Sequence, residues 1–173
     1  MKMISVLLML LMLALCAPLA GQVLVGSPED RSYQRISEEK DPEARLKLLM
    51  EFEKEFPQSV ILLNVELQIL DIYSQNDDRP HVIEYGEKIL KLDDRNITAM
   101  MALARNYALQ KMELDRALQL AQSAVDQIAK LKDGPMPKGY TEASWKEYLQ
   151  ATETAARGIL DYVKAIRSRP AVP

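Results

Sequence analysis

Apolar residues recur at three- and four-residue steps along most of the chain after Ser27, which is the spacing of one face of a helix. Ser27 and Pro28 predict the first helix start, because serine can cap free amides and proline suits the first helical position. Asp41 and Pro42 repeat this signal, and the second helix is expected to stop at Pro57. Its expected apolar side carries Leu46, Leu49, Met50 and Phe56.

Two longer helix pairs are expected to follow. Residues 59–75 are apolar on more than one face, as expected of a helix packed between neighbours. After a polar turn, Pro80 opens a second helix, whose narrower apolar stripe consists of Val82, Tyr85, Ile89 and Leu92. The second pair is expected near residues 96–110 and 113–131, where apolar side chains and alanines keep the helical steps.

A break then precedes one long final helix. A helix cannot continue through residues 132–141, which contain Gly134, Pro135, Pro137 and Gly139. Residues 142–167 predict a helix about 39 Å long, and the tail at 169–173 is expected to fray. The expected stripe of this helix is Trp145, Tyr148, Leu149, Thr152, Ala155, Ala156, Ile159, Tyr162, Val163 and Ile166. Trp145 is interpreted as a residue that docks the helix onto the domain.

The first 21 residues have the layout of a secretory signal peptide. Lys2 supplies the positive end, residues 4–16 form an uncharged apolar core, and small residues follow. We therefore expect an exported protein, periplasmic or secreted, whose mature chain starts near Gly21 or Gln22. Two alternatives stay open, a lipid anchor at Cys16 and an uncleaved anchor, since the apolar run approaches the length that spans a bilayer. Membrane contact is expected only in those two cases.

The charge of the chain changes little when the leader is removed. The sequence has 22 Lys and Arg against 25 Asp and Glu, so loss of Lys2 leaves 21 against 25, or −4. Without a basic excess, no counterion release drives binding to nucleic acid, and we expect no nucleic-acid partner. The single cysteine leaves with the leader, so the mature chain must rely on its core rather than on disulfides.

Tyr73 and Tyr107 lie near the ends of the first helices of the two longer pairs, 34 positions apart by subtraction. This spacing resembles the tetratricopeptide repeat (TPR) family, whose period is 34 residues. Ala104 matches the small residue that the family places three positions before the tyrosine, whereas Leu70 departs from it. The family's closing proline is also replaced, by Leu92-Asp93-Asp94.

The phrase FEKEFPQS at residues 52–59 is similar to the one that closes helix pairs in TPR proteins of the bacterial cell envelope. The resemblance covers residues 28–131. It implies a short right-handed α-solenoid of TPR-like antiparallel helix pairs, with a long C-terminal capping helix. We accordingly expect one all-α domain, made of a repeat region at 22–131 and a loop with the capping helix at 132–173. An unrelated antiparallel bundle would share the apolar periodicity and stays open as the alternative.

Few residues suit catalysis or metal binding. His81 is the only histidine, and its place beside Pro80 favours a solvated or locally bonded imidazole over a catalytic base. Acid pairs at helix ends lack the spacing of a calcium loop, and no phosphate-binding glycine loop occurs, so we expect no enzyme, metal or cofactor. Asn96 opens an Asn-Ile-Thr sequon, yet we favour its role as a helix cap. Gly86 stands alone in a helix, where a neighbouring helix is expected to approach closely.

The resemblance also implies where a partner would bind, since the first helix of each TPR pair lines the concave face. The implied peptide groove consists of Asn64, Leu67, Gln68 and Asp71 from one pair and Thr98, Met101, Ala102 and Arg105 from the next. Leu67 and Met101 would form the floor, and Asp71 and Arg105 the sides, which suits an amphipathic or extended peptide. The alternative is that Asp71 and Arg105 pair with each other across adjacent helices.

The resemblance implies a non-enzymatic scaffold that binds a protein or peptide in the cell envelope, as a subunit or assembly factor of a larger complex. The alternative is a structural protein that forms a homo-oligomer through the final helix, whose stripe would otherwise stay uncovered. A helical hydrolase without a recognisable motif is a distant third.

Overall fold

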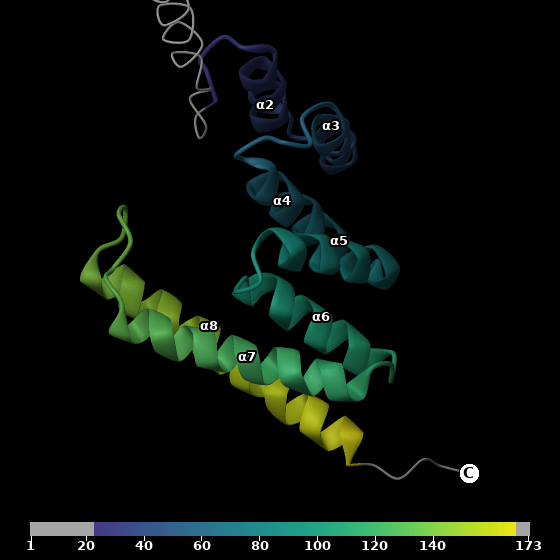
Figure 1. The fold of residues 1–173 in the computed structure, drawn as a ribbon, viewed down its shortest axis with the longest axis vertical. Helices are drawn as coiled ribbons and strands as arrows, with labels where there is room; N and C mark the ends of the chain where they lie inside the picture. The colour runs from purple at the N-terminus through teal and green to yellow at the C-terminus, as the bar shows by residue number, and fades with distance from the viewer. Residues whose placement is uncertain (1–22, 169–173) are drawn as a thin grey trace, which may run out of the picture.

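The computed structural model describes residues 23–168, and in this part of the chain every regular element is an α-helix. The expectation of an all-α protein is confirmed for these residues (Figure 1). The leader at 1–21, with Cys16, and the tail at 169–173 lie outside the described residues. In chain order the helices are α2 (Pro28–Glu38), α3 (Pro42–Glu55), α4 (Leu62–Gln75), α5 (Arg79–Leu92), α6 (Ile97–Leu109), α7 (Leu114–Asp133) and α8 (Glu142–Arg167).

Several helices begin at the capping residues that the sequence indicates. The Ser27 hydroxyl accepts a hydrogen bond from the Asp30 amide at 3.1 Å, and Asp41 caps α3 in the same way. Asn96 caps α6 by accepting from the Ala99 amide at 3.1 Å, so its predicted role as a helix cap is confirmed. These bonds satisfy amides that have no partner inside the helix.

Helix α4 begins at Leu62, later than the apolar pattern predicts. Residues 59–61 form a turn instead, in which the Ile61 amide donates to the Ser59 hydroxyl at 3.1 Å. Val60, expected on an apolar row, is 54% exposed. A serine hydroxyl that bonds nearby backbone competes with helix formation, and α4 starts without a side-chain cap.

Each helix packs against the next one along the chain, and α8 packs against both α6 and α7. Figure 1 shows the pairs α2–α3, α4–α5 and α6–α7 as successive levels of a stack. Helices α7 and α8 have 20 and 26 residues, and they run beyond the stack as an arm whose free end carries the loop at 134–141. None of the helices within residues 23–168 has both the length and the apolar character needed to span a bilayer.

The buried side chains form two clusters, which meet between α5 and α6. The N-terminal cluster lies mainly on α2–α5 and includes Phe52 and Ile69, and the C-terminal cluster lies on α6–α8 and includes Leu103 and Val163. A Cβ added to Gly86 would lie 2.7 Å from Leu103 Cγ. The close helix approach expected at Gly86 is therefore confirmed.

Some apolar side chains that were expected on the buried side of a helix are exposed, because the neighbouring helices cover only part of each apolar surface. Met50 is 44% exposed and Leu92 is 50% exposed, while Phe52 is fully buried on the core side of α3. On α8, Tyr148 and Tyr162 are 40% and 37% exposed. The side of α8 that is buried against α6 and α7 consists of Leu149, Ala156, Leu160 and Val163.

Candidate functional site

Two of the predicted groove residues on α4 are bonded to the first helix pair. The Asn64 side-chain oxygen accepts hydrogen bonds from the Tyr33 hydroxyl at 3.0 Å and from the Gln68 amide at 2.7 Å. Arg45 of α3 donates to the Gln68 side-chain oxygen at 2.5 Å. Leu67 is half-buried and packs against the N-terminal cluster. A partner at this part of α4 would have to compete with bonds that α2 and α3 already make.

Asp71 lies one turn further along α4 and is exposed. Its carboxylate accepts a hydrogen bond from Gln75 at 2.8 Å. Gln68 and Asp71 line a shallow hollow of about 180 Å³ together with Arg45. Asp71 and Arg105 form no ion pair with each other, so the alternative in which these two side chains pair is wrong.

Some of the predicted residues of α6 line a hollow together with a helix that the groove prediction did not include. Thr98 and Arg105 are exposed, and Met101 is half-buried. Met101 and Arg105 line a hollow of about 190 Å³, which we term the α6–α8 hollow; its other lining residues are Ser74, Asp77, Val82, Ala102, Asn106, Leu109 and Ile159. Ile159 comes from α8, so the structure joins three residues of the predicted groove, Met101, Ala102 and Arg105, to the final helix.

Two charged side chains, Asp77 and Arg105, line the α6–α8 hollow. Arg79 donates to both oxygens of the Asp77 carboxylate, at 3.1 and 3.3 Å. These bonds, with the charge of Arg79 and a smaller effect from Arg105, hold the pKa of Asp77 below its usual value. Asp77 is therefore ionised at neutral pH, and opposite charges at the rim can orient a bound peptide.

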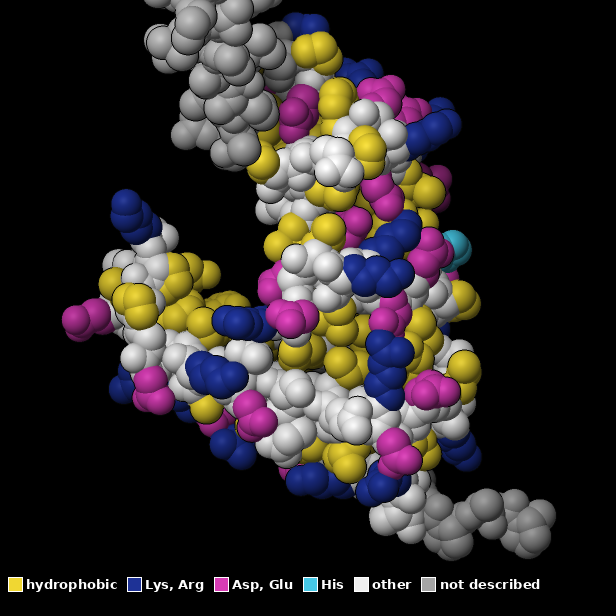
Figure 2. All heavy atoms as spheres, viewed as in Figure 1, with side chains coloured by type: hydrophobic (Ala, Val, Ile, Leu, Met, Phe, Trp, Pro, Cys, Tyr) yellow, Lys and Arg dark blue, Asp and Glu magenta, His cyan; other side chains and the backbone are white. Residues whose placement is uncertain are grey.

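A third hollow, which the sequence did not predict and which we term the arm-end hollow, lies at the free end of the arm. It has a volume of about 630 Å³ and is lined by residues from the end of α7, the following loop and the start of α8, including Met136, Trp145 and Leu149. Trp145 also packs against the C-terminal cluster, in line with its predicted docking role. Figure 2 shows hydrophobic side chains gathered at this end of the arm.

Three aromatic rings stand together beside the arm-end hollow. Trp145 stacks on Tyr148 with ring centroids 5.2 Å apart, and Tyr140 meets Trp145 edge-on at 5.1 Å. Tyr140 and Tyr148 are each 40% exposed. The spacing of Trp145 and Tyr148 on one helix is a sequence signal for this contact, whereas the position of Tyr140 depends on the fold of the loop.

The one histidine bonds locally, as predicted. His81 Nδ1 lies 2.8 Å from the Asp78 carboxylate, and the imidazole stacks on Tyr73 with centroids 4.4 Å apart. Within residues 23–168, no three His, Cys, Asp or Glu side chains are grouped so that they could hold a metal ion.

Comparison with protein-family models gives no match for this chain, and comparison with curated proteins gives none either. A functional proposal must therefore come from the residues. The α6–α8 hollow brings together Met101 and Arg105, while Asn64, Gln68 and Asp71 lie toward the first helix pair.

Proposed function

We propose that the protein is a non-enzymatic helical-repeat scaffold of the TPR kind, which binds a protein or peptide partner at the α6–α8 hollow. The observation that carries this proposal is the convergence of Met101 and Arg105 with Ile159 around one hollow. Two residues chosen for their place in a repeat thus share a concave surface with an apolar side chain of the final helix. Apolar side chains next to charged ones suit recognition of a peptide.

Two features support the repeat interpretation. Tyr73 and Tyr107 are both buried, at 8% and 6% exposure, near the ends of the first helices of successive pairs. Helix α8 packs on both α6 and α7, which is the place that the first helix of a further pair would take. In this proposal the pairs form a short right-handed solenoid, and α8 closes its end.

The hollow favours a partner with an apolar side chain next to charged ones. Met101 and Ile159 offer apolar contact, while Arg105 would pair with an acid of the partner and a base of the partner would share Asp77 with Arg79. The leader-like layout of residues 1–21 supports a place in the cell envelope. There the protein would act as a subunit or assembly factor of a larger complex.

The proposal is tested with a partner captured from the envelope fraction and then purified. Met101→Ala and Arg105→Ala should each weaken its binding about tenfold or more, measured by titration calorimetry, because both remove contacts in the hollow. Gln119→Ala, on the exposed side of α7, is the matched control and should bind like the parent. Circular dichroism checks that each variant folds. Equal affinity for all variants would show that the partner uses another surface, and Asp71→Ala then tests the hollow near α3.

A second candidate function is self-association through α8. An exposed, uncharged stripe runs along this helix and consists of Tyr148, Ala151, Ala155, Gly158 and Tyr162. Nothing lies within 4 Å of the place where a Cβ of Gly158 would sit. Uncovered apolar faces of this kind are common at interfaces between subunits. A dimer that Ala155→Glu converts to a monomer would favour this function, whereas a monomeric parent chain in solution would exclude it.

A further inference from the structure

Glu66 is a buried carboxylic acid in the middle of α4, and only 4% of its surface is exposed. Its Oε2 atom is buried without any hydrogen-bond partner. Helix α4 packs against α3 on one side and α5 on the other. A carboxylate without a partner in such an interior is costly, whereas the neutral acid is tolerated far better.

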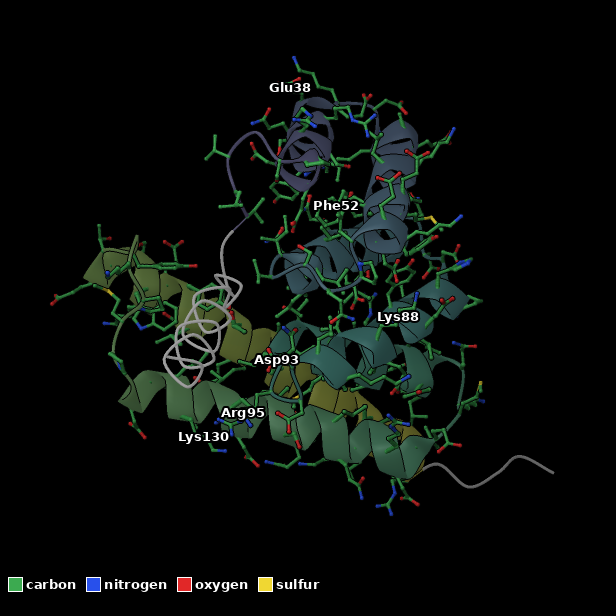
Figure 3. All side chains as sticks on the ribbon, turned by 45° about the horizontal axis from the view of Figure 1, so that its top comes forward. Glu38, Phe52, Lys88, Asp93, Arg95 and Lys130 are labelled. Carbon is green, nitrogen blue, oxygen red and sulfur yellow. The ribbon has the colours of Figure 1, made fainter. Side chains whose placement is uncertain are left out.

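The nearby charged groups on α3 and α5 are already engaged with each other. Glu53 of α3 accepts hydrogen bonds from the Tyr85 hydroxyl and from Lys88 Nζ, both at 2.9 Å. Lys88 also pairs with Glu84 of its own helix at 3.2 Å. Glu66 therefore lies near an acid and a lysine whose hydrogen bonds are directed elsewhere. Figure 3 labels Lys88 on α5 and Phe52, the residue before Glu53, on α3.

Burial, with the negative charge of Glu53 adding to it, raises the pKa of Glu66 from 4.5 to about 7, and Lys88 acts weakly in the opposite direction. Below pH 4.5 the folded and unfolded states both hold the proton. Between pH 4.5 and 7 the unfolded carboxyl loses its proton while the folded one keeps it, so this group destabilises the fold increasingly as the pH rises. Above pH 7 the folded protein holds an ionised Glu66, and the full cost is present.

We propose that Glu66 makes the joint between α3 and the α4–α5 pair sensitive to pH, so that the first helix pair loosens in mildly alkaline solution. Ionised Glu66 repels Glu53 and competes with it for Lys88. Loss of the bond from Lys88 to Glu53 removes one of the two side-chain bonds that hold Glu53 of α3 to α5, and leaves the one from Tyr85. Helix α5 stays in place, because Lys88 attracts the new carboxylate.

Few other polar side-chain bonds hold α3 to the α4–α5 pair. The link from α3 to α4 is short and contains Pro57, and the first turn of α4 has no side-chain cap. The remaining polar bonds across this joint are the one from the Tyr85 hydroxyl to Glu53, a contact of the Tyr73 hydroxyl with Met50 Sδ, the bonds of Asn64 and Gln68 to α2 and α3, and a bond between Ser59 and Glu29. None of these groups is a hydrogen-bond partner of the unbonded Glu66 oxygen, so none of them neutralises its charge when Glu66 is ionised.

Hydrogen exchange of the intact chain at pH 6 and pH 8.5 tests this proposal, after correction for intrinsic exchange rates. If the pKa of Glu66 returns to 4.5 in the opened state, the population in which α2 and α3 are open should rise about tenfold between these pH values. The amides of α6–α8 should change much less. Glu66→Gln should abolish the rise, whereas Glu84→Gln, which removes an exposed acid on the same lysine, should retain it.

Two results would overturn the proposal. One is an equal rise in the parent chain and in Glu66→Gln, and the other is a rise spread evenly over all the helices. The carboxyl carbon resonance of Glu66 gives a second measurement that needs no variant. A titration midpoint near 7 is expected, and one near 4.5 would show that this carboxyl is ordinary.

Discussion

Gly86→Ala isolates the close contact between α5 and α6. An added Cβ would lie 2.7 Å from Cγ of Leu103 and 2.9 Å from its Cδ2. Leu103 is fully buried, and its Cγ is the branch point of the side chain, so it cannot move aside alone. Overpacking of this kind costs about 1–3 kcal/mol, while alanine is about 1 kcal/mol better than glycine inside a helix. We expect a net loss of stability of about 1 kcal/mol.

Urea unfolding followed by far-UV circular dichroism measures this loss. Gly158→Ala is the matched control, because Gly158 also lies inside a helix but has nothing within 4 Å of a Cβ. It should stabilise the protein by about 0.5–1 kcal/mol. If both substitutions stabilised the protein equally, the close contact at Gly86 would have no effect on the free energy of unfolding.

A double-mutant cycle with Leu103→Ala separates the clash from helix propensity. Leu103→Ala alone should cost about 2–5 kcal/mol, because it leaves a cavity in the C-terminal cluster. In that background Gly86→Ala should change sign and stabilise the protein by up to about 1 kcal/mol. If Gly86→Ala still destabilised the Leu103→Ala protein, the loss would have another cause.

Two further substitutions test single groups. Asn96→Ala should cost about 1 kcal/mol in thermal unfolding because it removes the cap of α6, and Asn96→Asp should retain most of that stability, since a carboxylate accepts the same bond. Glu66→Gln should make the protein more stable by up to about 3 kcal/mol at pH 8.5 and change little at pH 4.5, measured by urea unfolding. The opposite pH trend would show that ionised Glu66 is well paired.

The sequence predicted the helices well because the signals at their ends are local. Pro28, Pro42 and Asn96 each act within one turn, so neighbouring residues suffice to locate the helix start. The exposed positions Met50 and Tyr162 could not be predicted in this way. Their helices have wide apolar arcs, and only the placement of neighbouring helices decides which part of the arc is covered.

The candidate site was accessible to sequence reasoning only in part. Met101 and Arg105 lie four positions apart, so a helix places them on one face whatever the tertiary structure is. Their shared hollow with Ile159 depends on where α8 returns after a glycine- and proline-rich loop. Glu66 was missed, although a helix with apolar residues on several faces has few exposed positions for its polar ones.

We expect α8 to hold the C-terminal cluster together rather than to form an independent arm. Leu160 and Val163 pack in the cluster with α6 and α7 and are only 6% and 0% exposed. Leu160→Ala should therefore lower the free energy of unfolding by about 2–5 kcal/mol. Tyr162→Ala, on the exposed side of the same turn, should cost less than about 1 kcal/mol. A chain that ends at Gly134 should unfold at a markedly lower temperature and with less cooperativity, because the apolar faces of α6 and α7 lose their cover. An unchanged melting temperature after that truncation would show that α8 adds nothing to the stability of the stack, and it would leave partner binding or self-association as its only role.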